Sequence, residues 1–154
     1  MPMIRTRQAS AARTAVGSRM VQFITAAVIC AVFVVLGAVI ALFKHDLKAL
    51  LAFSTVSHLG LITMLLGTGT AFGAMAAVFH ILNHATFKAA LFMSAGIVDH
   101  EAHTRDIRRL GGLRHLMPIT FVIATIASLS MAGIPFLNGF LSKEMMLEEA
   151  WHTE

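Results

Sequence analysis

The chain has 154 residues, of which 57% are hydrophobic and only 13% are charged. Soluble proteins carry about 25% charged residues, so this composition excludes an ordinary soluble domain and predicts a membrane protein with several spans. The net charge of +4 lies mainly in a tail and in loops, where it sets membrane orientation, and no interleaving of aromatic and basic residues points to a nucleic-acid partner. The single cysteine, Cys30, excludes a disulfide framework within one chain.

Residues 1–20 form a basic tail that differs from everything after it. Arg5, Arg7, Arg13 and Arg19 alternate with small and polar residues, and no acidic residue is present. Such a composition is typical of presequences, whereas the apolar run that follows is too long for the core of a secretory signal. The alternative, which we favour, is a disordered or non-native tail that does not belong to the membrane domain, residues 21–154.

Three apolar runs follow the tail, and each is long enough to cross a bilayer as a helix. Polar clusters or glycines separate them, and the third contains one lysine but no Asp, Glu or Arg. A longer polar connection then leads to a fourth run, which Pro118 opens in the manner of a helix's first turn. The predicted spans are Met20–Phe43, Leu47–Leu66 and Ala71–Val98, followed by the run after Pro118.

The fourth apolar run contains its own interruption. Pro135 lacks a backbone donor and clashes with the preceding helical turn, and the nearby Gly133 and Gly139 make it easier to leave helical geometry. A broken helix at membrane depth requires protein or a water-filled cavity around the freed backbone groups. Lys143 is then either a second buried cation just beyond the break, or a solvent-exposed residue after the helix has ended.

The distribution of charge predicts the topology. With four alternating spans, the Lys44–Lys48 and Asp99–His115 connections lie on one side, and their excess of Lys and Arg makes that side cytoplasmic. The Arg-rich tail then falls on the opposite side, against the same rule. The conflict disappears if residues 1–19 are foreign to the membrane domain or if helices that precede it are missing, which is a first indication of a partial chain.

The third span carries the most informative pattern. His80, His84 and Lys88 are spaced four residues apart, so each is displaced by only about 40° around the helix from the one before. Asn83 lies nearby but off this line. Groups that exchange protons near neutral pH and share one face can form a proton relay. The alternative is a set of hydrogen bonds between helices.

The same spacing could hold a metal ion, but the sequence does not complete such a site. A zincin requires His-Glu-x-x-His, whereas Ile-Leu-Asn stands between His80 and His84. The apolar spans supply no carboxylate as a further ligand. We therefore expect neither a metal nor another cofactor in this chain.

The second span begins with Asp46-Leu-Lys48, and Ser54, Ser57 and His58 share one helical face further along it. By composition alone, Lys48 is an interfacial residue whose ammonium extends to the lipid headgroups.

Three motifs together resemble one family. The first is Asp46-Leu-Lys48 through Ser57-His58-Leu-Gly60, the second runs from Phe79 to Met93 and includes the His80–His84–Lys88 pattern, and the third is Gly139-Phe-Leu-Ser-Lys143-Glu. In this order and spacing they resemble the antiporter-like membrane subunits of Mrp-type cation/proton antiporters and of respiratory complex I. The sequence from Gly96 to Leu113 is more similar to the Mrp A-type subunit than to a complex I subunit.

The resemblance implies a hydrated polar axis in the membrane plane. It assigns Lys48, His80, His84, Lys88 and Lys143 to that axis, with Asp46, Ser57, His58 and Asn83 in support, and it places Lys143 at a helix break. It covers about residues 21–151. The family's upstream pair, a buried Glu and a Lys on earlier helices, has no counterpart here, so the resemblance implies an internal piece of a longer subunit.

Three functions remain open at this point. The resemblance favours Na⁺/H⁺ antiport within a hetero-oligomeric complex of the bacterial inner membrane, where the partners are other subunits, lipid, protons and monovalent cations, and the chain itself is no enzyme. The second is a proton-pumping subunit of an NADH:quinone oxidoreductase. The third is a remnant that transports nothing.

Overall fold

The computed structural model describes residues 2–152, without the side chains of residues 2–20, 23 and 152. The fold is all-α, as predicted, and three of its helices are long and apolar enough to cross a membrane. A shorter apolar helix follows them. The elements are α1 (Pro2–Leu42), α2 (Leu47–Gly67), α3 (Ala71–Ala102), the 3₁₀ helix η1 (Ile107–Arg109), α4 (Leu113–Leu116), α5 (Pro118–Ala132) and α6 (Asn138–His152).

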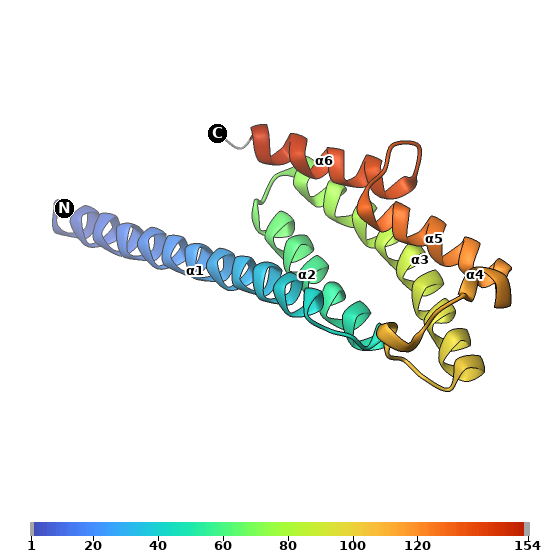
Figure 1. Ribbon diagram of the computed structural model, residues 1–154. Coiled ribbons are helices and arrows are strands. Elements are labelled where there is room, and N and C mark those ends of the chain that lie inside the picture. Colours follow the sequence, from blue (N-terminus) through green and yellow to red (C-terminus); the bar gives the residue numbers. More distant parts are fainter. Residues whose placement is uncertain (1, 153–154) are drawn as a thin grey trace.

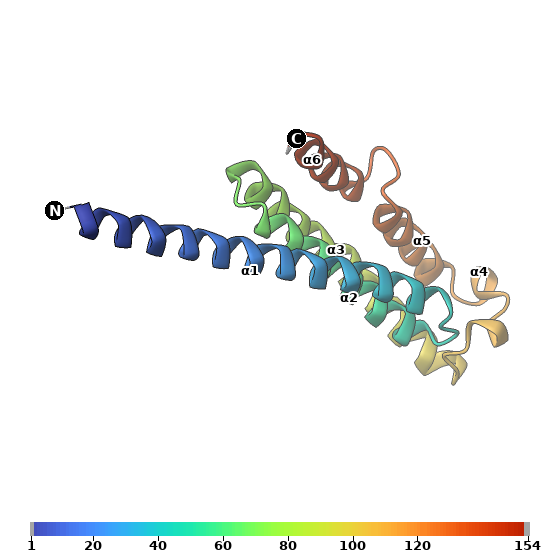
Figure 2. The ribbon, with the colours of Figure 1, turned by 90° about the vertical axis from the view of Figure 1, so that its left-hand side faces the viewer.

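Helix α3 is the centre of the arrangement. It packs against α2 on one side and against α5 and α6 on the other, while α1 packs against α2 (Figure 1). Figure 2 shows the same order from the side, with α1 and α6 at opposite edges of the bundle. Large apolar side chains remain exposed along most helices, which fits a surface that faces lipid or further membrane helices rather than water.

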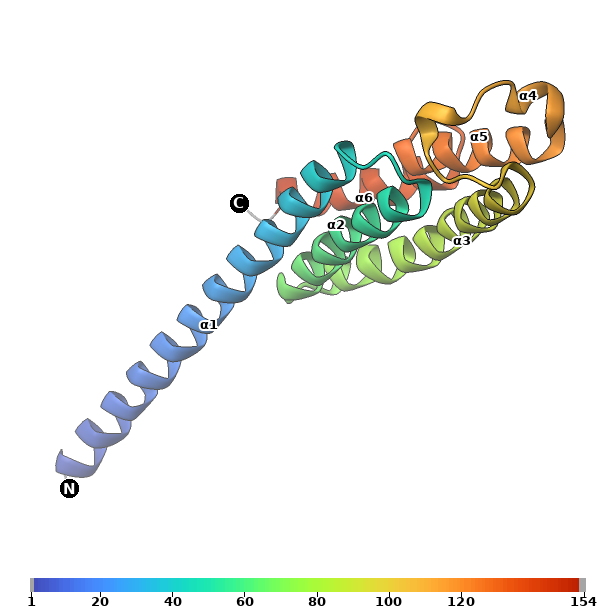
Figure 3. The same ribbon diagram turned by 60° about the horizontal axis from the view of Figure 1, so that its bottom comes forward.

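Helix α1 is longer than the span predicted for it. It runs without interruption from Pro2 to Leu42 and projects far beyond the other helices (Figure 3). The part of α1 that is long and apolar enough to cross a membrane is Ile24–Leu42. Residues 2–20 of the basic tail therefore continue the helix. That the tail does not belong to the membrane domain stays a prediction.

Polar side chains define where α2 and α3 begin. The carboxylate of Asp46 accepts a hydrogen bond from the backbone N–H of Ala49 at 3.0 Å, and the hydroxyl of Thr70 accepts one from Gly73 at 2.9 Å. Both are N-caps, which satisfy backbone donors that the first helical turn leaves free. Asp46, predicted to support the polar axis, thus fixes the start of the helix that carries Lys48.

The two connections predicted to share one side of the membrane pair with each other. The N–H of Leu47 donates to the Arg105 carbonyl at 3.1 Å, and that of Ile107 donates to the His45 carbonyl at 2.9 Å. They form an isolated antiparallel bridge between Asp46 and Asp106. Arg108 donates to the Asp106 carboxylate and lowers the pKa of that group to about 2.

The predicted break in the last apolar segment is confirmed. Helix α5 ends at Ala132, and the next residue, Gly133, caps it with a φ of +83°, a left-handed conformation that glycine adopts readily. Helix α6 restarts at Asn138, after an exposed connection that contains Pro135 and Phe136. Gly139 lets the two half-helices cross, because a Cβ on it would overlap the Ser130 carbonyl oxygen.

Candidate functional site

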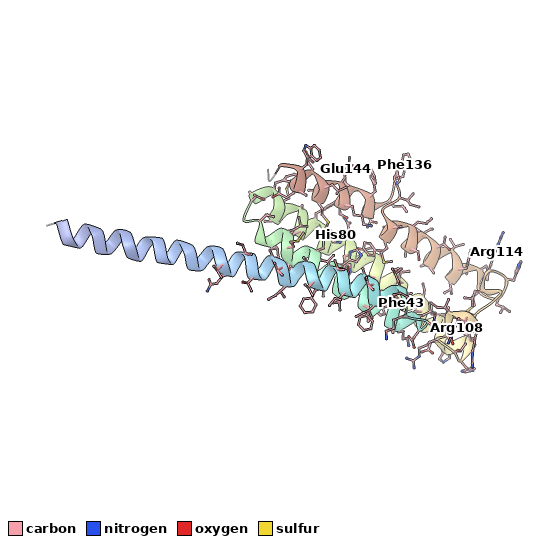
Figure 4. The ribbon with its side chains drawn as sticks, turned by 60° about the vertical axis from the view of Figure 1, so that its left-hand side comes forward. Phe43, His80, Arg108, Arg114, Phe136 and Glu144 are labelled. Carbon is pink, nitrogen blue, oxygen red and sulfur yellow. The ribbon has the colours of Figure 1, made fainter. Side chains whose placement is uncertain are left out.

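The His80–His84–Lys88 face of α3 points into the bundle. All three side chains are buried, and so is Asn83; Figure 4 shows His80 lying in the interior between the helices. The opposite face of α3 carries apolar residues such as Met75 and Val78, which are exposed. The helix therefore turns its polar stripe inward and its apolar side outward, the reverse of a soluble amphipathic helix.

Helix α2 anchors the ammonium of Lys88. Its Nζ donates to the backbone carbonyl of Leu51 at 3.2 Å and to the hydroxyl of Ser54. Both partners are neutral, so the cation is held by dipoles rather than by an opposite charge. A buried lysine held in this way is solvated only partly by its protein partners.

Three imidazole rings meet between α2 and α3. His58 Nδ1 lies 3.1 Å from His80 Nε2, and the two rings stack with centroids 5.3 Å apart. The ring of His84 is 5.0 Å from that of His58, and Phe87 contacts the group with the edge-to-face geometry typical of aromatic pairs. His58, expected only to support the axis, thus contacts His80 and His84, two of the residues that the resemblance assigns to it.

The group extends to α6 through Ser142, whose Oγ lies 3.0 Å from His80 Nδ1. Ser142 is fully buried. The next residue, Lys143, turns back and donates to the Met131 carbonyl at 2.8 Å and to the Ala132 carbonyl at 3.0 Å, at the C-terminal end of α5. The sequence motif contained Ser142, but nothing in its spacing showed that it would bind His80.

Asn83 ties α3 to the helix break. Its Oδ1 accepts a hydrogen bond from Asn138 Nδ2 at 3.2 Å, and Asn138 in turn accepts one from Ser130. This amide pair fixes the start of α6 against α3. Asn83 thus contacts the start of the broken helix, and the support of the axis predicted for it stays a prediction.

Lys48 and Ser57 lie apart from this group. Lys48 Nζ is 2.6 Å from the Asp99 carboxylate, which also pairs with Arg105 at 3.2 Å, and its side chain is 38% exposed. The hydroxyl of Ser57 faces α1 and donates to the Val34 carbonyl at 2.8 Å. Asp99 was not among the predicted site residues; its position four residues before His103, near the end of α3, gave no sign of this partner.

These contacts define what we call the polar row, which consists of Ser54, His58, His80, His84, Lys88 and Ser142. Each imidazole can both donate and accept a proton. In the part of the chain that the structure describes, His84 Nε2 has no protein hydrogen-bond partner although it is buried. A water bridge to this nitrogen would be about as favourable as a direct hydrogen bond.

Long apolar helices around a buried row of titratable groups define the class, a multi-pass membrane protein. The family can be named more narrowly. A family model described as NADH:quinone oxidoreductase/Mrp antiporter, transmembrane, matches residues 7–154, and the chain belongs to that family. The match takes in much of the basic tail, whereas the motifs alone placed the start of the resemblance near residue 21.

Large antiporter subunits of the A type are among the relatives that the chain resembles. It is 68% identical over 118 residues to the probable K(+)/H(+) antiporter A/B-type subunit of Rhizobium meliloti, covering 77% of this chain and 12% of the relative. It is 56% identical over 123 residues to the Na(+)/H(+) antiporter A-type subunit of Alkalihalophilus pseudofirmus, covering 71% of this chain and 15% of the relative. The chain thus spans only a small part of their length.

Solved structures agree with this placement. The Mrp complex from Dietzia sp. DQ12-45-1b contains a chain that is 46% identical, with a TM-score of 0.71, over 75% of this chain and 13% of that one. A chain of the membrane-bound sulfane sulfur reductase, an archaeal respiratory membrane complex, is 32% identical with a TM-score of 0.81. This match covers 86% of this chain and 27% of that one.

Proposed function

We propose that the chain is part of the A-type subunit of a cation/proton antiporter and that its polar row conducts protons. The observation that carries this proposal is the contact of His58 with His80, and of His80 with Ser142, between three helices, of which α2 and α3 are long and apolar enough to span a membrane. Structural hydrogen bonding alone would not require three imidazoles and a lysine in one buried group. The high identity to antiporter subunits of this type supports it.

In this proposal a proton moves between Lys88 and His84, passes along the imidazoles, and reaches α6 at Ser142 and Lys143. A bridging water completes the step between Lys88 and His84. Adjacent cations repel each other strongly where few dipoles screen them, so arrival of a proton at one site favours departure from the next. Coupling to the exchange of a monovalent cation would take place in the complete complex, with other subunits as partners.

We propose a bacterial inner membrane location, with the Lys44–Lys48 and Asp99–His115 connections in the cytoplasm. The excess of basic residues in these connections supports that orientation, and so does their pairing into one surface.

A second candidate is a proton-pumping subunit of a respiratory complex. It draws support from the likeness to the archaeal sulfane sulfur reductase, which covers more of this chain than the likeness to the Mrp complex does. In that case, proton movement would depend on electron transfer in neighbouring subunits. Neighbouring genes would separate the two: small antiporter subunits favour the first, flavin and iron–sulfur subunits the second.

Everted membrane vesicles test both functions. Vesicles that contain the chain together with the products of its neighbouring genes are first acidified by respiration in a host that lacks its own antiporters. A pH-sensitive dye should then report proton efflux when Na⁺ or K⁺ is added. If neither Na⁺ nor K⁺ produces proton efflux, antiport is contradicted. Proton uptake that depends on an electron donor and requires these subunits supports the respiratory alternative.

A further inference from the structure

A buried carboxylate lies on α6, outside the polar row. Glu149 is only 4% exposed, whereas Glu144 and Glu148 on the same helix are exposed. It accepts a hydrogen bond from the hydroxyl of Thr70, the residue that caps the start of α3. A charged group in such a place is costly and is rarely retained without a role.

Glu149 and Lys143 line one cavity. Its volume is about 410 Å³, and residues of α2 and α6 form its walls. The two residues are six apart on α6, which corresponds to a rise of about 9 Å along the helix and a turn of about 240° around it. Most of the lining is apolar, and Lys143, Glu149 and Thr68 are its polar residues.

This places Glu149 beyond the last group of the polar row. The row reaches α6 at Ser142, and Lys143 follows directly. Glu149 lies further along α6, where this helix meets the turn between α2 and α3; Figure 1 shows that turn beside the C-terminal part of α6. The Lys48–Asp99 pair lies at the opposite end of α2 and α3.

The geometry points to Glu149 as the group that exchanges protons between Lys143 and the aqueous phase on the side of the α2–α3 turn. This inference rests on the proposed function. The Lys143 ammonium gives a proton to the Glu149 carboxylate through water and becomes a neutral amine. The carboxylic acid then releases the proton to the aqueous phase, and the same two steps run in reverse for uptake. Glycine at position 73 leaves room for the Glu149 carboxylate, since a Cβ there would lie 3.0 Å from it.

Glu149→Gln tests this inference in the vesicle assay described above. Glutamine can still accept the hydrogen bond from Thr70, so it keeps the contact between α6 and the turn, but it cannot carry a proton. We expect cation-dependent proton efflux to fall roughly tenfold or more at matched amounts of protein in the membrane. Glu148→Gln is the matched control: it removes the same charge from an exposed neighbour and should leave efflux at the wild-type rate.

Further readouts separate a proton carrier from a structural contact. Glu149→Asp should restore part of the efflux and change its pH profile, whereas a purely structural residue would leave that profile as in wild type. The inference is overturned if Glu149→Gln shows the wild-type efflux rate and pH profile in the same experiment in which Lys88→Ala abolishes efflux. If wild-type vesicles show no cation-dependent efflux at all, the proposed antiport function fails instead.

Discussion

The Lys143 ammonium lies 2.8 Å from the Met131 carbonyl oxygen, so a side chain of α6 caps the C-terminal end of α5 across the helix break. Helix C-termini carry partial negative charge and attract cations. Gly133 makes this contact possible, because a Cβ there would stand 2.9 Å from Lys143 Cδ. The charge of Lys143 and the geometry of the break are therefore linked, since a neutral amine would hold the two carbonyls less strongly.

Lys88→Ala should reduce cation-dependent proton efflux to background while the protein still inserts normally or slightly better. The change removes a buried cation, which relieves a desolvation cost, but it also removes the group that exchanges protons with His84. Lys88→Arg should impair efflux too, because a guanidinium does not release its proton near neutral pH. Dye-monitored efflux in everted vesicles measures both.

The control for Lys88 is Lys44→Ala, which removes a cation from the first connection, where its ammonium lies 5.2 Å from the ring centroid of Phe53. It should leave efflux unchanged. Wild-type efflux in both Lys88 variants at matched expression would mean that Lys88 is structural.

Ser142→Ala should slow efflux, because it removes the hydroxyl that links His80 to α6. Loss of one buried hydrogen bond also lowers stability by about 1 kcal/mol. Ser94→Ala is a suitable control, because Ser94 is a buried serine on α3. The hydrogen bond described for its hydroxyl stays within that helix and goes to the Ala90 carbonyl. Equal efflux in the two variants would contradict a role for Ser142 in the row.

Gly139→Ala should destabilise the crossing of α5 and α6 by about 1–3 kcal/mol, the usual range for an overpacked site. The new methyl group would overlap the Ser130 carbonyl oxygen, which is backbone and moves little. Gly96→Ala adds the same methyl group where no atom lies within 4 Å and should be neutral or mildly stabilising. The aggregation temperature of the detergent-solubilised protein compares them, and an unchanged value for Gly139→Ala would refute the crossing.

Orientation can be read from single cysteines introduced into a Cys30→Ala background. Gly111→Cys lies in the Asp99–His115 connection and Ala71→Cys lies at the α2–α3 turn, and both positions are exposed. A membrane-impermeant thiol reagent should label Gly111→Cys in everted vesicles but not in intact cells. Ala71→Cys should show the opposite pattern, and the reverse result for both would invert the proposed topology.

The pairing of the two connections should persist through the acidic range. The pKa of Asp106 in the folded protein is about 2, below its usual value of 3.8. The stabilisation from its pairing with Arg108 is therefore fully present above about 3.8 and is lost as the pH falls toward 2. The Ile107 amide donates to the His45 carbonyl and reports on the pairing. Between pH 5 and 8, the pH dependence of its hydrogen exchange should be the same in the wild type as in Asp106→Asn, because Asp106 does not titrate in this range.

The apolar runs predicted the spans closely because burial in lipid leaves few alternatives to a helix. The second span was predicted as Leu47–Leu66 and ends at Gly67. The third continues to Ala102 and stops where His103 adopts a left-handed conformation. Pro135 marked the break, and helical spacing alone placed His80, His84 and Lys88 on one face.

The contacts between helices could not be predicted from spacing. Ser54 and His58 turn toward α3 while Ser57, on the same predicted face, bonds to α1. The partners of Lys48 and of Ser142 lie 51 and 62 residues away in the sequence. Such pairs depend on how the helices pack, and a single sequence contains no direct signal for them.

The backbone bridge between the two connections has a mechanical consequence. It pins the start of α2 to the segment that follows α3 through main-chain hydrogen bonds at residues 45–47 and 105–107. At the other end, the described hydrogen bond between α6 and the turn is a side-chain contact, Thr70–Glu149. We expect any rotation of α6 relative to α2 and α3 to have its axis near the bridged end. The displacement then grows with distance from that end and is largest around Glu149.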